Sequence, residues 1–326
     1  IRFYRMNGYE TLWQPGTDHA GIATQAVVEK KLLEKGVKKE QLGREKFIKE
    51  VWKWKKDSGD QILNQLKKLG CSCDWSRNRF TMDKDLSEAV IKTFVKLYNE
   101  KIIYKDTKLV NWDTKLETAI SDLEVEQREV QSNLYYIRYK IEGESNYLTI
   151  ATTRPETMLG DTAIAVNPKD KRYKKYIGKK VIVPIVERKV KIIADKYVSI
   201  EQGSGALKVT PAHDFNDFEI GKRHKLEFIN IFEKNGKLNN SVPQDLIGLD
   251  RFDARKIITT KLKELNLLEK IENIKNAIPY GDRSNSIIEP LLTEQWFADA
   301  KFLSKKAIQA VKKKKTIFFP VNWSKT

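Results

Sequence analysis

The sequence predicts an α/β fold in which one core is interrupted by an inserted, β-barrel-like α+β domain. In residues 1–134, apolar side chains recur every three or four positions over long stretches, which is typical of amphipathic helices. From Tyr135 the pattern changes to short, alternating segments rich in β-branched residues, with turn residues between them. The segment 279–326 leaves that pattern again. We therefore expect three parts, 1–134, 135–278 and 279–326, of which the middle part is the β-rich one.

Composition limits the kind of partner. The chain has 326 residues, enough for one large domain or two ordinary ones. Lys and Arg outnumber Asp and Glu by 61 to 44, a net charge of +17. This charge fits a polyanion such as RNA, and it fits equally well a lysine-rich surface that is only solvated. No apolar run reaches membrane-spanning length and no signal-peptide pattern is found at the start, so we expect a soluble, cytoplasmic protein without a membrane partner.

The two cysteines, Cys71 and Cys73, give little chemistry. A single C-x-C pair supplies neither a disulfide framework nor the four ligands of a structural zinc site. We therefore predict a reducing compartment and no metal.

The first part begins with a short predicted strand at Thr11–Trp13, which the polar segment Pro15–Gly21 ends. A helix is expected over about 22–33 because its apolar residues recur at helical spacing. A polar loop between a strand and a helix is where α/β sheets commonly bind ligands. Asp18 and His19 in this loop either contact such a ligand or cap the helix.

Further helices and one strand are expected before residue 134. Helical faces run over 44–69, with a kink or break near 57–60, and a second helix covers 86–99 with Asp85 as its cap. A strand is expected at Tyr104–Trp112, followed by a ribbon at Ser121–Val125.

The inserted part is predicted to be mainly β-structure. Its strands are expected at 135–141, 147–152, 163–166, 181–186 and 190–193. Helices should cover Asp214–His224 and Arg251–Leu265, the second introduced by Asp250, and Asn235-Gly236 should form a hairpin turn.

Two polar stretches about fifty residues apart carry the chemistry of this part. They are 151–161 and 203–217, each after an apolar, strand-like run, at 147–150 and 197–200. Because proline stops a strand from continuing, both should end as loops at a strand edge. They combine hydroxyls, cations and carboxylates, which suits a small, charged, hydroxyl-bearing substrate. Taken singly, the same groups also fit a turn and a helix cap. The groups are Thr152, Thr153, Thr157, Thr210, Arg154, Lys208, Asp161, Asp214 and Asp217.

These stretches resemble the editing-domain motifs of the valyl-tRNA synthetase family. The residues that carry the resemblance are Thr-Thr-Arg-Pro-Glu-Thr at 152–157 and Pro-Ala-His-Asp-Phe-Asn-Asp at 211–217. The segments 15–25 and 279–297 resemble the Rossmann-type catalytic core of the same family, so the resemblance covers nearly the whole chain in three blocks. The family's HIGH-type and KMSKS-type motifs are missing. We expect them upstream and downstream, in a longer synthetase of which this chain is an internal fragment.

The resemblance implies a partial Rossmann-type core with a connecting ribbon at 1–134, an editing domain at 135–278 and a return into the core at 279–326. It implies that the full-length enzyme charges tRNA(Val) with valine, using ATP with Mg²⁺, and that the inserted domain hydrolyses mischarged threonyl-tRNA(Val) without a cofactor. A cytoplasmic monomer is expected. The fragment alone should not activate valine, while its editing domain could still cleave an ester.

The resemblance also implies roles for single residues. In the editing pocket, Asp217 would hold the substrate ammonium and rank above His213 as a candidate catalytic group. In the synthetic site, Asp18 would bind the amino group of valine and Trp296 would pack its side chain. Gln202 stands where the family often has a phenylalanine. The remaining editing residues are Lys208 and Thr153 as catalytic groups, and Arg154, Thr210, Asp214 and Thr152 as substrate-binding groups.

Two further departures from the family are visible, and two other functions remain open. Some relatives carry a cysteine-ligated zinc near the ribbon, but this chain has Asp113 and no cysteine nearby, so no metal is expected there. Asn285 replaces a glycine, which affects a turn. The alternatives are a free-standing aminoacyl-tRNA editing hydrolase, which needs no Rossmann-type flanks, and a non-catalytic basic RNA-binding module, which explains the charge but not the clustered polar loops.

Overall fold

The computed structural model describes residues 1–325 and divides the chain into two compact units. Unit 1 contains Ile1–Tyr104 together with the C-terminal segment from Phe297, and unit 2 contains Lys105–Trp296. Unit 2 therefore encloses the predicted editing-domain range and extends beyond it on both sides. Within residues 1–325, no helix is both long and apolar enough to cross a membrane.

Unit 1 is mainly helical. Its two strands, β1 and β2, have two residues each and pair in parallel through Gly16↔Arg79 and Thr17↔Phe80. Among its described residues, only one hydrophobic side chain, that of Val28, is buried. The elements are α1 (Arg2–Met6), β1 (Gly16–Thr17), α2 (Gly21–Glu34), α3 (Lys39–Ser58), α4 (Gln61–Lys68), η1 (Trp75–Arg77), β2 (Arg79–Phe80), α5 (Lys84–Asn99), α8 (Ala300–Lys312) and η6 (Val321–Lys325).

Two predictions for unit 1 are wrong. Thr11–Trp13 forms no strand, and Leu12 and Trp13 are exposed, because no neighbouring strand pairs with this segment in the described chain. Helix α5 begins after Asp83 rather than after Asp85, with the Asp83 carboxylate accepting a hydrogen bond from the backbone N–H of Phe80 at 2.9 Å. The predicted helix at 22–33 and the break near 57–60 are confirmed by α2 and by the end of α3 at Ser58.

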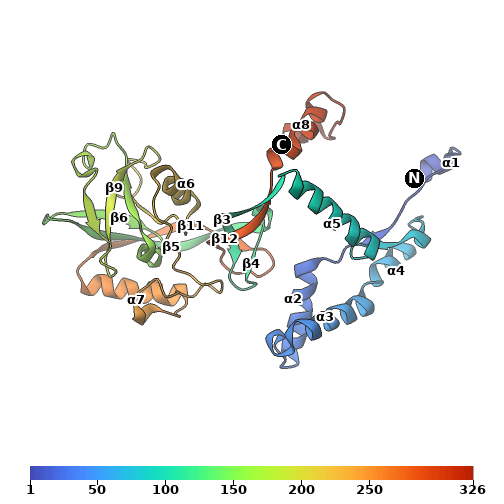
Figure 1. Cartoon of the computed structure of the whole chain (residues 1–326), viewed down its shortest axis with the longest axis horizontal. Coiled ribbons are helices and arrows are strands. Elements are labelled where there is room, and N and C mark those ends of the chain that lie inside the picture. The colour runs from blue at the N-terminus through green and yellow to red at the C-terminus, as the bar shows by residue number, and fades with distance from the viewer. Residues whose placement is uncertain (326) are drawn as a thin grey trace. The chain divides into compact units, whose positions relative to one another are not determined.

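Unit 2 is mainly β-structure with two longer helices (Figure 1). The helices are α6 (Phe215–His224) and α7 (Arg251–Glu264), and the unit also contains the 3₁₀ turns η2 (Asp122–Glu124), η3 (Pro155–Gly160), η4 (Lys174–Tyr176) and η5 (Gln244–Leu246). The strands are β3 (Ile103–Asp113), β4 (Thr118–Ala119), β5 (Val125–Ile141), β6 (Tyr147–Thr152), β7 (Ala163–Val166), β8 (Lys180–Ile182), β9 (Lys189–Ala194), β10 (Ala206–Val209), β11 (Leu268–Gly281) and β12 (Glu289–Ala298).

The strands form a seven-stranded sheet and a three-stranded sheet. The larger sheet has the order β10-β7-β9-β8-β5-β11, with β6 pairing to β5, and the smaller sheet has the order β12-β3-β4. Strands β7 and β9 run parallel, while β10 pairs antiparallel with β7. The larger sheet curls into a half-barrel, so a mixed α/β fold is confirmed, and the insertion of this domain into a Rossmann-type core stays a prediction.

Two predicted strands differ from the structure. Strand β8 ends at Ile182, short of the expected 186, and Pro184, which has no N–H to donate, follows two residues later. The run 197–200 before the second polar stretch is a turn, not a strand. Strand β10 lies inside the stretch itself and carries Lys208 directly to the site.

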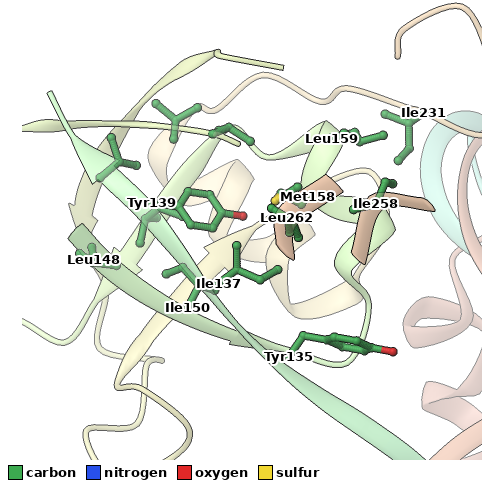
Figure 2. Packing of buried hydrophobic residues seen from close by; sticks show 14 of the residues in the cluster. Tyr135, Ile137, Tyr139, Leu148, Ile150, Met158, Leu159, Ile231, Ile258 and Leu262 are labelled. Carbon is green, nitrogen blue, oxygen red and sulfur yellow. The ribbon is translucent and has the colours of Figure 1, made fainter. Parts of the chain in front are cut away.

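The main core of unit 2 lies on the concave side of this sheet. Along β5 the residues Ile137, Tyr139 and Ile141 are buried and alternate with exposed ones, as a strand with one covered face requires. Figure 2 shows Ile258 and Leu262 of α7 beside Met158 and Leu159 of η3, and this packing closes the core. Helix α7 therefore holds η3, and with it the first polar stretch, against the sheet.

A second, smaller core lies on the other face of β7. Ala163, Ala165 and Val209 pack there with Ile220 of α6. Because the Asp214 carboxylate caps α6 by accepting hydrogen bonds from the backbone N–H groups of Asn216 and Asp217, the start of α6 is fixed beside the end of β10. The predicted caps of α6 and α7 are confirmed, the second through Asp250.

Candidate functional site

A cavity of about 170 Å³ lies in unit 2 where β6 and β10 end and α6 begins. All seven residues predicted for the editing pocket line it. From the first polar stretch these are Thr152, Thr153 and Arg154, and from the second they are Lys208, Thr210, Asp214 and Asp217. At Gly203 (φ 58°), an added Cβ would lie 3.0 Å from that of Ala151, so the backbones of the two stretches approach closely only because this residue is a glycine.

Lys208 is buried in the cavity wall and is held by three oxygen atoms. Its ammonium donates to the hydroxyl of Thr157 at 2.7 Å and to that of Thr210 at 2.5 Å, and it lies 3.4 Å from a carboxylate oxygen of Asp161. Asp161 also accepts hydrogen bonds from the Thr210 hydroxyl at 2.6 Å and the Tyr139 hydroxyl at 2.8 Å. The lysine is therefore fixed in position by a network within the core.

Burial dominates the electrostatics of this network. It raises the pKa of the Asp161 carboxyl, while the Lys208 ammonium and the hydrogen bonds from Thr210, Tyr139 and Lys208 oppose the rise. Burial and the neighbouring Asp161 raise the pKa of Tyr139 far above its ordinary value, so its hydroxyl stays a donor at neutral pH. Tyr139 was not predicted as a site residue, and Asp161 was named among the polar groups of the first stretch but was given no role in the pocket. Asp161 ends the first polar stretch, but Tyr139 gives no sequence signal beyond that of a core residue.

Asp217 is a buried carboxyl with an altered pKa. Burial, together with the nearby carboxylate of Asp214, raises the pKa of Asp217 to about 7, although Lys208 acts in the opposite direction. One of its oxygens accepts a hydrogen bond from the backbone N–H of Thr210 at 2.9 Å. A carboxyl of this kind gains from a positive partner, because an ammonium group beside it would favour its charged form.

Arg154 lines the cavity, but its guanidinium is already engaged. One nitrogen donates to the backbone carbonyl of His213 at 3.0 Å, a second is paired with Glu289, and the third lies 3.6 Å from Glu156. Burial lowers the pKa of Arg154, but the Glu289 and Glu156 carboxylates outweigh this effect and hold the pKa above its usual value. All three guanidinium nitrogens of Arg154 therefore face partners within the protein, and its predicted role as a substrate-binding group stays a prediction.

The side chains of Thr152 and His213 accept hydrogen bonds from backbone N–H groups of the protein itself. The Thr152 hydroxyl accepts the N–H of Arg154 at 3.1 Å and shapes the turn after β6. Burial, with the cations of Arg154 and Lys208, lowers the pKa of His213 far below its ordinary value, and the Nε2 atom of this neutral ring accepts the N–H of Ile231 at 3.0 Å. This arrangement agrees with the ranking of His213 below Asp217.

Outside the two polar stretches, one lining residue, Tyr197, was missed by the sequence reasoning. The side chain of Tyr197 is 53% exposed at the cavity, while Gln202, the position where the family often has an aromatic residue, does not line it. The backbone N–H of Tyr197 donates to Asp195 at 2.9 Å, and Asp195 is anchored to α6 through Arg223, also at 2.9 Å. The signal was an aromatic side chain directly before a polar stretch, in a run interpreted as a strand.

The two residues predicted for a synthetic site lie in different units. Asp18 lines a separate cavity of about 620 Å³ in unit 1, and its carboxylate accepts the N–H of Ala20 at 2.5 Å at the start of α2. Trp296 lies on β12 at the end of unit 2, with its ring 5.4 Å from the ammonium of Lys105. Their roles toward valine stay predictions.

The described residues 1–325 contain no group of three or more His, Cys, Asp and Glu side chains that could hold a metal ion. Near the ribbon, Asp113 is buried and accepts the backbone N–H groups of Lys115 at 2.9 Å and Leu116 at 3.0 Å. Its same oxygen accepts the hydroxyl of Ser286 at 3.1 Å. These hydrogen bonds close the loop between β3 and β4 onto the segment before β12.

Comparison with known proteins shows the family to which the chain belongs. A family model described as tRNA synthetases class I (I, L, M and V) matches residues 1–326, so the chain belongs to the class I tRNA synthetases. It is 68% identical over its whole length to the valine--tRNA ligase of Pelagibacter ubique, 56% identical to that of Bradyrhizobium diazoefficiens and 51% identical to that of Dechloromonas aromatica. It covers 37%, 36% and 35% of these three relatives, about a third of their length.

Proposed function

We propose that the chain is part of a valine–tRNA ligase and that unit 2 hydrolyses threonyl-tRNA(Val). The observation that carries this proposal is that one cavity is lined by threonine hydroxyls from both polar stretches and by Lys208 and Asp217 from the second stretch. Its volume of about 170 Å³ is below the roughly 300–1,000 Å³ of sites for drug-sized ligands, so an aminoacyl group fits better than a whole nucleotide.

A valine-specific ligase needs such a second site for a physical reason. Threonine has nearly the shape of valine, and a hydrophobic pocket rejects it by only about a hundredfold, a value that is known for the valyl enzyme itself. A site that binds the threonine hydroxyl can discriminate more strongly, because valine would leave buried polar groups unpaired.

The hydrogen bonds indicate how the cavity would prefer threonine. The hydroxyl hydrogen of Thr210 is donated to Asp161, so its oxygen can only accept a further bond, and the Asp214 carboxylate is also an acceptor. A threonine hydroxyl can donate to such an acceptor, whereas the corresponding methyl of valine cannot. Asp217 would hold the substrate ammonium by a charge-assisted bond, and Thr153 would line the side-chain end of the pocket.

Hydrolysis requires a water molecule to attack the ester carbonyl carbon. The bond between this carbon and the ribose oxygen then breaks, giving free threonine and the ribose hydroxyl of tRNA. In this proposal the fixed Lys208 ammonium stabilises negative charge that develops on the carbonyl oxygen, since its position needs no rearrangement during the reaction.

The charging reaction is proposed only for the whole protein. Its substrates would be valine, tRNA(Val) and ATP with Mg²⁺, in a cytoplasmic monomer. No described residue is assigned to ATP or to Mg²⁺. When bound, ATP would supply the adenylate that activates valine.

Two alternatives are less well supported. A free-standing editing hydrolase does not explain why the family match extends through unit 1. A non-catalytic RNA-binding module explains the charge of +17 but not a buried lysine and a buried carboxyl on one cavity. An ATP-exchange assay with valine, made on the whole protein, beside a deacylation assay separates the three functions.

The experiment measures hydrolysis of threonyl-tRNA(Val) and valyl-tRNA(Val) by the purified chain. We expect the threonyl ester to be cleaved faster. Asp217→Ala should lower kcat/KM for it by about 10- to 100-fold, because a charge-assisted bond is lost. Asp253→Ala, on the exposed side of α7, is the matched control and should leave the rate unchanged. Equal rates for wild type and Asp217→Ala would refute the assignment of Asp217.

A further inference from the structure

A buried to half-buried cluster of five charged side chains adjoins the pocket, and it contains three arginines and two glutamates. Arg154 and Glu156 come from the first polar stretch, Arg251 and Arg255 come from α7, and Glu289 is the first residue of β12. Both carboxylates are almost completely buried, Glu156 at 0% and Glu289 at 2% exposure. Burial of a charge is costly unless it is paired, so the geometry of this cluster is closely determined.

Glu156 and Glu289 divide the arginines between them. Arg255 binds Glu156 with two hydrogen bonds, at 2.8 and 2.7 Å. Glu289 is paired with Arg154 through one oxygen, and its other oxygen lies 3.6 Å from Arg251. Since Arg255 already binds both carboxylate oxygens of Glu156, the main charged partner of Arg154 is Glu289.

The other end of the Arg154 guanidinium is hydrogen-bonded to the backbone of the second polar stretch. It donates to the carbonyl of His213 at 3.0 Å, in the segment that joins β10 to α6. The N–H of His213 in turn donates to the carbonyl of Thr210 at 3.0 Å. This segment carries Thr210 and Asp214 into the cavity and leads directly to Asp217.

We propose that Glu289 is a positioning residue for the editing pocket: it holds Arg154 against the His213 carbonyl and keeps its guanidinium away from Asp214 and Asp217. Without Glu289, the positive charge of Arg154 is drawn to the pocket carboxylates, where it competes with the substrate ammonium. The catalytic part of this inference rests on the proposed function. Glu289 lies on β12, the strand through which the chain leaves unit 2.

The first test is a double-mutant cycle on threonyl-tRNA(Val) hydrolysis. We expect Glu289→Gln to raise KM by about tenfold with a smaller change in kcat, because an internal cation now competes for the ammonium site. Glu289→Asp, which keeps the charge on a shorter side chain, should recover part of this loss. When Arg154→Ala is already present, Glu289→Gln should have no further effect on KM.

The control for general destabilisation is Val181→Ala. This residue is fully buried in the main core on β8, a strand that contributes no residue to the pocket lining, so the variant loses stability through a cavity while the pocket arginine keeps its partners. We expect its KM to equal that of wild type. Multiplicative effects of Glu289→Gln and Arg154→Ala on KM, or a Val181→Ala variant with the same KM change as Glu289→Gln, would overturn the proposal.

The second test does not depend on activity. Hydrogen exchange is followed by mass spectrometry in a peptide covering 207–217 and in the strand peptide 163–166. For each peptide, the exchange rate in Glu289→Gln is divided by the rate in wild type. We expect this ratio to be about tenfold larger for 207–217 than for 163–166. Unchanged relative exchange would overturn the positioning role, whatever the chain hydrolyses. If the exchange changes but wild type cleaves no threonyl ester, then the proposed function is wrong and the positioning of the loop by Glu289 stands.

Discussion

Replacing Asp217 with asparagine should stabilise unit 2 at alkaline pH, although it removes a pocket carboxylate. The pKa of Asp217 is about 7 in the folded protein, against an ordinary value of 3.8, because the folded protein buries this carboxyl beside Asp214. Below about pH 4 both states are protonated and the difference has no effect. Between pH 4 and pH 7 the unfolded chain loses its proton while the folded protein keeps it, so stability falls as pH rises.

The magnitude follows from this difference. A tenfold change in a protonation equilibrium corresponds to about 1.4 kcal/mol, so ionisation of Asp217 destabilises the fold by up to about 4 kcal/mol above pH 7 and by about 1.5 kcal/mol at pH 5. The substituted asparagine would carry no charge, and its side-chain oxygen can still accept the hydrogen bond from the N–H of Thr210. Asp217→Asn should therefore be more stable than wild type, and most clearly so at pH 8.

Hydrogen exchange in the strand peptides 163–166 and 206–209 measures this effect inside unit 2. Wild type and variant are compared at the same pH, so the intrinsic exchange rates cancel. The variant should exchange more slowly by up to about a thousandfold at pH 8 and by about tenfold at pH 5. Asp253→Asn, an exposed change on α7, should have almost no effect at either pH. Equal protection at pH 8, or a difference that does not shrink at pH 5, would refute the electrostatic argument.

Three further predictions test the pocket and the core. Tyr197→Ala should raise KM for threonyl-tRNA(Val) by about 5- to 100-fold if the exposed ring stacks on an unpaired base, and Tyr197→Phe should not. Tyr139→Phe removes a hydrogen-bond donor from buried Asp161 and should lower the free energy of unfolding, measured by urea denaturation, by about 1 kcal/mol. The same variant should have a few-fold lower kcat, because Asp161 also holds Lys208. Leu262→Ala should cost about 2–5 kcal/mol, since this side chain is fully buried in the main core, whereas Ile257→Ala on the exposed side of the same helix should cost far less.

Each of these has a result that would contradict it. The same KM for Tyr197→Ala and wild type would exclude stacking at this residue. A Tyr139→Phe enzyme with unaltered kcat would show that Asp161 positions Lys208 without help from the tyrosine. Equal losses for the two α7 variants would mean that this helix does not close the core through the face that carries Leu262.

Local sequence determined the helices and much of the pocket. The N-caps Asp214 and Asp250 were predictable because a cap depends only on the next two or three residues. Alternation along 135–141 predicted the buried face of β5 in the same way. The seven residues predicted for the editing pocket were also named from the sequence, because each polar stretch is continuous and the cavity forms where β6 and β10 end.

Contacts between distant segments were decided only by the tertiary structure. The pairing of Arg154 with Glu289 joins residues 135 positions apart, and Tyr139 donates to Asp161 across 22 positions. The mistaken strand at Thr11–Trp13 has the same origin, since a strand exists only where a partner strand lies beside it. Residue types and spacing fix the conformation of a segment and its chemical groups. The partner of each buried charge depends on how the sheet and helices pack, because only packing brings those segments within hydrogen-bond distance.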